Sequence, residues 1–249
     1  MSSFYCFIPA RLKSTRFPNK MLVNVKGKSL IRYVYSKCLK SKFFKDVVVA
    51  TCDKKIFREI VDNKGKAIMT SSSHEGCISR IAEAVIKTKK IKKSDYICIV
   101  QGDEVLVDFH LLNSLCLFIK KQKNNYDIVN VVSKIKNDKE YKSQSVIKAL
   151  VGENDYIFNM LRKNNLHKEK FFNQSISKKI FRQTGIIILK KVFLLEYSKL
   201  KRSFFEIKES IDMLRFIEND YKIRSFPIKK TMIGIDTKKD YINFLKNYR

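Results

Sequence analysis

The sequence has no run of about 18 uncharged apolar residues, the length that a transmembrane helix requires. Its start, MSSFYCFIPARLK, lacks a basic leader followed by an apolar core and a small-residue cleavage site, so we expect no secretory signal. The six cysteines are scattered and form no C-x-x-C pair. We therefore expect a protein of the reducing cytoplasm, with four buried free thiols and neither a disulfide framework nor a structural zinc ion.

Two common phosphate-binding motifs are also missing. The chain contains neither G-x-x-x-x-G-K-[ST] nor G-x-G-x-x-G. Histidine is scarce, with three residues in 249, and no Ser/His/Asp or Cys/His arrangement typical of a protein nucleophile is evident. The sequence does not favour a reaction that depends on covalent catalysis by the protein.

Acidic residues are few. The 24 Asp and Glu stand against 52 Lys and Arg, which gives a net charge of +28. Such an excess is typical of nucleic-acid binding. Here, however, it is mostly Lys spread along the whole chain, whereas readers of bases and phosphates rely on Arg for bidentate contacts. We expect an anionic small molecule as the partner and no specific nucleic acid.

Short apolar runs alternate with helical patterns over the first half of the chain. Nearly continuous apolar strands joined by helices predict a mostly parallel sheet covered on both faces, and hence an α/β fold. The expected strands are 4–9, 47–52, 67–69 and 96–100, and the expected helices are 29–40, 54–63, 79–87 and 108–121.

The second half departs from this rhythm. A hairpin with its turn at 152–155 follows the strand expected at 127–132, and the segment 159–179 is polar, which suggests an insertion or a flap. A further strand, a helix and an extended segment are expected at 185–189, 205–219 and 222–227. The last helix is opened by the pair Asp236 and Thr237. One domain with an insertion fits this pattern best.

Cations are concentrated after the first strand, in the segment FIPARLKSTRFPNKML. Arg11, Lys13, Arg16 and Lys20 fall within ten residues, at the strand end where open α/β sheets bind ligands. A loop of this kind, stiffened by Pro18, suits a polyphosphate. The alternative is a solvated basic loop.

Carboxylates occur at two comparable places. In VQGDE an apolar strand runs directly into Asp103, which can hold a divalent ion that bridges phosphate oxygens, while Gly102 would let the backbone approach a ligand closely. Asp236, in IGIDT, is the second candidate. Its alternative interpretation is the N-cap of the last helix.

Together, IPARLKSTRFPNKML, VVVATCD, VQGDE and GIDT closely resemble the 3-deoxy-manno-octulosonate (KDO) cytidylyltransferases, from about residue 4 to residue 245. The resemblance implies a single nucleotidyltransferase domain, Rossmann-like or GT-A-like, with a β-rich dimerisation insertion at roughly 133–182 and a homodimer. It also implies Mg²⁺-dependent transfer of CMP from CTP to an acidic sugar, with release of pyrophosphate, for lipopolysaccharide or capsule synthesis.

The resemblance also assigns roles to individual residues. The catalytic group would be Asp103, Asp236, Lys20 and Arg16, of which Asp103 and Asp236 would hold the metal. The nucleotide would be bound by Ala10, Arg11, Ser14, Arg16, Lys20, His74, Arg80 and Gln101. The sugar would be bound by Gln101, Arg162, Gln183, Glu209 and Met213.

The chain departs from the family pattern at two places. The base-side loop keeps only His74 and Arg80 of its motif. In the sugar pocket, Gln183, Ile187 and Met213 stand where the family has His, Tyr and Gln, and for Ile187 and Met213 we favour ordinary packing. The sugar is therefore KDO or, alternatively, an amino-KDO or a nine-carbon ulosonic acid. A catalytically silent nucleotide-binding homologue is the other alternative.

Overall fold

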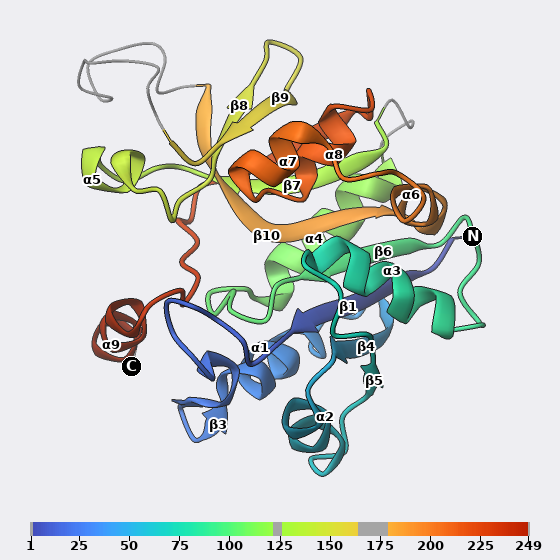
Figure 1. The fold of residues 1–249 in the computed structure, drawn as a ribbon, viewed down its shortest axis with the longest axis vertical. Helices are drawn as coiled ribbons and strands as arrows, with labels where there is room; N and C mark the ends of the chain where they lie inside the picture. The colour runs from blue at the N-terminus through green and yellow to red at the C-terminus, as the bar shows by residue number, and fades with distance from the viewer. Residues whose placement is uncertain (1, 122–125, 164–178, 249) are drawn as a thin grey trace. The chain divides into compact units, whose positions relative to one another are not determined.

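A computed structural model of the chain describes residues 2–121, 126–163 and 179–248 (Figure 1). The chain divides into two compact units. Unit 1 comprises Met1–Gln122, Lys190–Ser198 and Ile233–Arg249, and unit 2 comprises Lys123–Leu189 and Lys199–Met232. Unit 2 contains the whole segment 133–182 in which we expect the insertion, and the role of that segment in dimerisation stays a prediction.

Unit 1 contains a parallel sheet in the order β5-β4-β1-β6. Its strands are β1 (Phe4–Ala10), β4 (Phe44–Thr51), β5 (Ala67–Met69) and β6 (Tyr96–Val100). All seven residues of β1 are buried, as a continuous apolar run predicts for a strand covered on both faces. The short elements η1 (Lys20–Leu22), β2 (Asn24–Val25) and β3 (Lys28–Ser29) follow β1.

The helices of unit 1 are α1 (Leu30–Cys38), α2 (Lys54–Val61), α3 (Cys77–Lys87), α4 (Phe109–Lys121), α6 (Lys191–Tyr197) and α9 (Lys238–Asn247). In this unit α1 packs against α2 and α4, and α3 packs against β1 and α6 (Figure 1). The four strands and four helices expected in the first half of the chain are therefore confirmed, with ends that shift by at most three residues.

Buried thiols fill part of this core. Cys6 and Cys98 are register partners on β1 and β6, and Cys38 and Cys116 come from α1 and α4. All four are free and fully buried, as expected. Burial raises the pKa of the Cys6 and Cys116 thiols well above its ordinary value, so these side chains pack as small apolar groups.

Unit 2 is built mainly from antiparallel strands. They are β7 (Ile128–Ser133), β8 (Lys148–Val151), β9 (Tyr156–Leu161), β10 (Ile180–Lys190) and β11 (Ile223–Ile228), and only the β7–β11 pair is parallel among the described pairings within this unit. The predicted hairpin is confirmed, because β8 and β9 pair on either side of the turn at 152–155. The helices are α5 (Asp138–Lys142), α7 (Phe204–Glu209) and α8 (Met213–Ile217).

Two predictions for unit 2 are wrong. The helix expected at 205–219 is two short helices, because Ser210 adopts the left-handed conformation with φ 52° and ends α7. The irregular segment expected at 159–179 begins as strand, since 159–161 belong to β9. Residues 164–178 of that segment lie outside the described residues.

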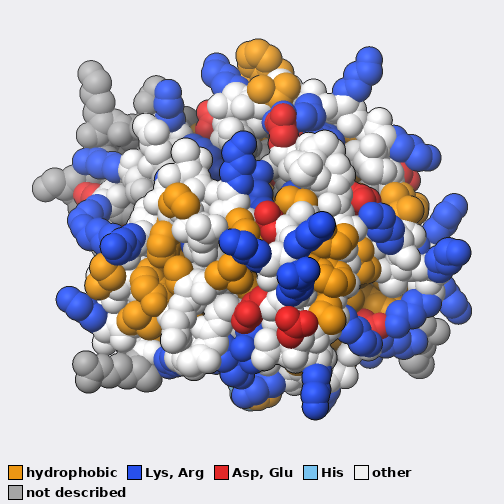
Figure 2. Space-filling model, turned by 60° about the horizontal axis from the view of Figure 1, so that its bottom comes forward, with side chains coloured by type: hydrophobic (Ala, Val, Ile, Leu, Met, Phe, Trp, Pro, Cys, Tyr) orange, Lys and Arg blue, Asp and Glu red, His pale blue; other side chains and the backbone are white. Residues whose placement is uncertain are grey.

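The surface reflects the scarcity of acidic residues. On the face drawn in Figure 2, Lys and Arg side chains are scattered across the surface among smaller groups of hydrophobic and acidic ones. Among the residues that the structure describes, no helix is both long enough and apolar enough to cross a membrane.

A buried ion pair joins α7 to α8. The guanidinium of Arg215 contacts both carboxylate oxygens of Glu206 at 2.6 Å, and the two residues are 7% and 2% exposed. Glu206 also accepts a hydrogen bond from the backbone N–H of Ser203 at the start of α7. Burial alone raises the pKa of Glu206, but the hydrogen bonds and charge of Arg215 outweigh it, so the pKa lies below its ordinary value.

The substitution Arg215→Met is expected to lower the free energy of unfolding by roughly 3 kcal/mol, because it leaves the buried Glu206 carboxylate with only the longer contact of 3.3 Å to the partly exposed Arg202. Urea denaturation at neutral pH measures this loss. Lys179→Met is the control, since it removes the exposed Lys179–Glu153 pair (3.2 Å), which is worth about 0–1 kcal/mol. Equal losses of unfolding free energy in the two variants would contradict the conclusion that the buried pair contributes more to stability than the exposed one.

Candidate functional site

The strand order of unit 1 has a switch point between β1 and β6. The next strands along the chain, β4 and β5, lie on one side of β1, and β6 lies on the other. Open α/β sheets bind ligands at the carboxyl ends of strands where the order reverses in this way. The basic loop 11–20 follows β1 and the segment Gln101–Glu104 follows β6, so both predicted motifs lie at this point.

The basic loop is fixed to the sheet by hydrogen bonds. Asp53, which follows β4, accepts a hydrogen bond of 2.8 Å from the N–H of Leu12. At the other end of the loop, the N–H of Asn19 donates to the carbonyl of Leu12 over 3.1 Å, and Asn19 is left-handed with φ 57°. Sequence reasoning missed this role of Asp53, although the residue ends the motif VVVATCD.

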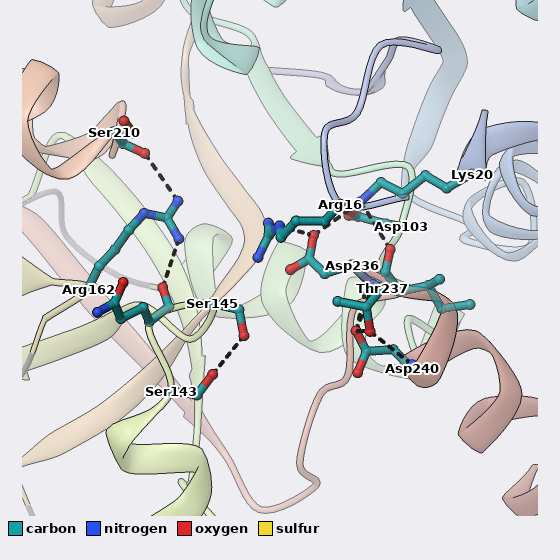
Figure 3. A network of polar contacts seen from close by, with 12 residues as sticks. Arg16, Lys20, Asp103, Ser143, Ser145, Arg162, Ser210, Asp236, Thr237 and Asp240 are labelled. Carbon is teal, nitrogen blue, oxygen red and sulfur yellow. Dashed lines mark hydrogen bonds and ion pairs between the residues drawn. The ribbon is translucent and has the colours of Figure 1, made fainter. Parts of the chain in front are cut away.

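Three charged side chains meet at the switch point (Figure 3). The ammonium of Lys20 lies 2.6 Å from Oδ2 of Asp103, 3.1 Å from Oδ1 of Asp236 and 3.0 Å from the carbonyl of Ile235. Lys20 is 7% exposed. Burial lowers the pKa of Lys20, but the two carboxylates more than offset this effect and raise the pKa above its ordinary value. The side chain is therefore a charged ammonium held between two carboxylates.

Arg16 extends the cluster toward solvent. Its Nη2 lies 3.1 Å from the same oxygen of Asp236 that Lys20 contacts. The Arg16 side chain is 47% exposed, so it can reach a ligand outside the protein surface. The structure thus brings together all four residues of the predicted catalytic group.

Asp236 is not the N-cap of the last helix, so that alternative is wrong. Thr237 is the N-cap of α9, and its Oγ1 accepts a hydrogen bond from the N–H of Asp240. The Asp240 carboxylate in turn accepts from the N–H groups of Thr237 and Asp236. The capping box fixes the backbone before α9 and leaves the Asp236 carboxylate directed at Lys20 (Figure 3).

Asp103 and Asp236 have the donor chemistry that Mg²⁺ prefers. Their oxygens converge on one cation, the Lys20 ammonium, and carboxylate oxygens are hard ligands. No group of three or more His, Cys, Asp and Glu side chains suited to a metal ion occurs among residues 2–121, 126–163 and 179–248. Two carboxylates that need phosphate oxygens and water to complete a coordination shell fit the way Mg²⁺ is bound in nucleotide enzymes.

Gly102 is required by packing within the protein. A Cβ atom at this position would lie 2.9 Å from Cδ1 of Ile31, 3.1 Å from Sδ of Met21 and 3.3 Å from the carbonyl oxygen of Pro9. The expectation that this glycine also serves the approach of a ligand stays a prediction. It allows the loop after β6 to lie against β1 and α1.

Arg80 and His74 shape the loop before α3. The buried guanidinium of Arg80 donates to Oγ1 of Thr70 and to the carbonyls of Ser71 and His74. The ring of His74 contacts Glu83. Burial alone raises the pKa of Glu83, but hydrogen bonds from Lys87, the Ser71 backbone and His74 lower it to about 2.

The other residues expected at the nucleotide lie around the same strand ends. Ala10 is the buried last residue of β1, and Ser14 lies half-buried in the loop. Arg11 donates to the carbonyl of Glu75 over 3.4 Å, and Gln101 donates to the thiol of Cys77 over 3.7 Å. Contact of these residues, and of His74 and Arg80, with a nucleotide stays a prediction.

The residues expected at the sugar, apart from Gln101, belong to unit 2. Arg162 is bound to the C-terminal end of α7, where its Nε donates to the carbonyl of Glu209 over 2.8 Å and its Nη2 to the carbonyl of Ser210 over 3.1 Å (Figure 3). Gln183 lies on β10, and Met213, 2% exposed, is the first residue of α8. The burial of Met213 fits the packing interpretation, and its contact with a sugar stays a prediction.

Sequence reasoning missed Lys148. This lysine of β8 is 2% exposed, and its ammonium donates to the carbonyls of Ser143, Val146 and Arg162. Burial and the charge of Arg162 lower the pKa of Lys148 to about 8, although Glu209 opposes the shift. No motif marks a lysine held by backbone carbonyls, because the acceptors carry no sequence information.

Comparisons with known proteins point to one family. The family model named cytidylyltransferase matches residues 5–224. The 3-deoxy-manno-octulosonate cytidylyltransferase of Fusobacterium nucleatum is 35% identical over 246 residues, 98% of this chain and 97% of the relative. That of Thermodesulfovibrio yellowstonii is 33% identical over 242 residues, 94% of each. The solved structure of CMP:2-keto-3-deoxy-manno-octonic acid synthetase complexed with CTP is 26% identical, with a TM-score of 0.83, over 98% of this chain and 100% of that chain.

The fold is shared with a synthetase complexed with CTP over 98% of this chain, and together with the charged switch point it defines a nucleotidyltransferase. The expected α/β nucleotidyltransferase fold is confirmed. Within that class, the chain belongs to the 3-deoxy-manno-octulosonate cytidylyltransferase family, as its motifs predicted.

Gly102→Ala is expected to lower the free energy of unfolding by about 1–3 kcal/mol, because the added methyl group overlaps Ile31 and approaches the Pro9 carbonyl. Gly152→Ala is the matched control, since its Cβ would meet nothing closer than 3.7 Å. Chemical denaturation of the two variants and the wild type measures the difference. A loss for Gly152→Ala as large as that for Gly102→Ala would refute the packing explanation.

Lys148 gives a pH-dependent prediction. Its folded pKa of about 8 lies below the unfolded value, so the unfolded chain binds more protons above that pH and the wild type gains stability as the pH rises. Lys148→Met lacks this contribution. The free energy of unfolding of the wild type minus that of the variant should therefore increase from about pH 7 to about pH 9. Denaturation curves at both pH values measure it, and a constant difference would contradict the shifted pKa.

Proposed function

We propose that the protein transfers CMP from CTP to KDO or a close ulosonic acid and releases pyrophosphate. The observation that carries the proposal is the Lys20, Asp103 and Asp236 cluster at the switch point of the sheet. The names of the relatives and the CTP in the related structure support the choice of nucleotide and sugar.

The reaction must overcome repulsion between anions. In this proposal the anomeric hydroxyl oxygen of the sugar attacks the α-phosphorus of CTP, the bond from that phosphorus to the β-phosphate oxygen breaks, and the hydroxyl proton is released to water. The sugar carboxylate and the triphosphate are both negative, so cations stabilise the transition state more than neutral residues would. Arg11 and Arg16 are exposed and can bind the phosphate oxygens.

Asp103 and Asp236 are the residues that would hold Mg²⁺. When bound, the ion would neutralise charge on the phosphate oxygens and orient them for in-line displacement. The protein itself supplies position and charge. Asp103 is the third residue after β6, and the capping box of α9 fixes the backbone at Asp236, so both carboxylates lie next to regular elements.

The proposal also covers the sugar substrate, the cellular location and pathway, and the oligomeric state. Arg162 is the candidate for the sugar carboxylate, and the changes at Gln183, Ile187 and Met213 favour a ulosonic acid with an amino or apolar substituent as the second candidate. We propose a cytoplasmic homodimer that supplies lipopolysaccharide or capsule synthesis. CTP and the acidic sugar are its partners.

Pyrophosphate release with CTP and Mg²⁺ tests the proposal across a panel of KDO, its 8-amino analogue and nine-carbon ulosonic acids. Release of pyrophosphate with KDO supports KDO as the substrate. Faster release with another sugar of the panel identifies that sugar as the substrate. Binding of CTP with no release from any sugar would favour the catalytically silent homologue and overturn the proposed reaction.

Asp103→Asn is expected to lower turnover by about 100-fold or more, because it removes one of the two charges that would hold the metal. Asp62→Asn, at an exposed position after α2, is the control and should leave turnover unchanged. Initial rates at saturating CTP, with circular dichroism to verify folding, provide the comparison. A folded Asp103→Asn variant with near-normal turnover would rule out the metal assignment.

A further inference from the structure

The charges within the cluster balance one another. Asp103 and Asp236 contribute two negative charges, and Lys20 and Arg16 contribute two positive ones within 3.1 Å. The Lys20 ammonium has three N–H donors and three acceptors, the two carboxylates and the carbonyl of Ile235. It therefore occupies the space between the carboxylates as a fully coordinated cation.

A divalent ion bound in the space between these carboxylates would compete with the ammonium for the same oxygens. Oδ2 of Asp103 and Oδ1 of Asp236 are the atoms that face Lys20. At such distances a second cation would be strongly repelled by the ammonium, because Lys20 is buried and solvent screens the interaction poorly. A metal ion and the Lys20 ammonium therefore cannot both occupy the space between these two carboxylate oxygens.

We propose that Lys20 is a built-in counter-ion that keeps divalent metal off Asp103 and Asp236 until the triphosphate draws its ammonium away. The proposal rests on the proposed function and adds an order of events to it. The phosphates of the nucleotide offer Lys20 and Arg16 a new set of anionic oxygens. The two carboxylates are then uncompensated, and only then do they accept the metal.

Two simpler roles for Lys20 give different expectations. If Lys20 were only a phosphate ligand, its removal would not change metal binding in the absence of nucleotide. If it were only a structural tie between β6 and the segment before α9, its removal would loosen the carboxylates and weaken metal binding. The counter-ion role alone predicts that metal binding without nucleotide becomes tighter when the charge is removed.

The test measures binding of Mn²⁺ alone, without nucleotide or sugar, by electron paramagnetic resonance. Lys20→Met should bind Mn²⁺ at least about tenfold more tightly than the wild type, because two carboxylates lose their cation. Lys20→Arg keeps the charge and should bind as weakly as the wild type. Lys45→Met, which removes an exposed lysine of β4, controls for the change in net charge. Asp103→Asn added to Lys20→Met should abolish the gain.

Thermal unfolding gives a second readout. In EDTA, Lys20→Met should unfold at a lower temperature than the wild type, since the facing carboxylates repel each other, and Mg²⁺ should restore the midpoint of the variant while leaving that of the wild type nearly unchanged. Lys20→Gln replaces Lys20→Met if the latter does not fold. Mn²⁺ affinity of a folded, neutral variant equal to that of the wild type overturns the counter-ion role. Because no arm contains a nucleotide or sugar, failure of the pyrophosphate assay would overturn the proposed reaction and leave this result intact.

Discussion

The buried ammonium of Lys20 is the contact on which the arrangement of the site depends. It joins three segments that are distant in the sequence: the loop after β1, the end of β6 and the backbone before α9. A charge taken out of water in this way is stable only when it is paired and fully hydrogen-bonded. The need to satisfy one ammonium therefore fixes the relative positions of two carboxylates that would otherwise repel each other.

The elements around the site hold its charged residues in position. Asp53 holds the start of the basic loop, Gly102 lets the loop after β6 lie close to Pro9, and the Thr237–Asp240 capping box fixes the last segment. Each of these features acts through hydrogen bonds to the backbone or through close packing. None of them uses the charged groups of Lys20, Asp103 or Asp236. Arg16, more exposed than the rest, is the group in this cluster with the most freedom to follow a ligand.

Much of unit 1 could be predicted from the sequence, because a strand buried on both faces must be a continuous apolar run. The basic loop and Asp103 could be placed at neighbouring strand ends from the pattern, but the approach of Asp236 to Lys20 could be predicted only from the resemblance, since no local pattern relates residues 216 positions apart. The break at Ser210 was not predictable, because the left-handed conformation there is adopted by a serine and the usual glycine signal is absent. Lys148 was missed for a related reason, since its partners are backbone carbonyls that any residue can supply.

The sequence separation within the cluster has a consequence for how the protein is made. Ribosomes synthesise Lys20 first and Asp236 216 residues later, after the whole of unit 2. Asp103 follows 83 residues after Lys20, and until the end of the interval the ammonium still lacks the second carboxylate and the Ile235 carbonyl. Contacts between residues so far apart form late because they require the intervening chain to be closed into a loop. Completion of the charged cluster is thus a late event in biosynthesis, and a nascent chain acquires its finished site only after both units have been translated.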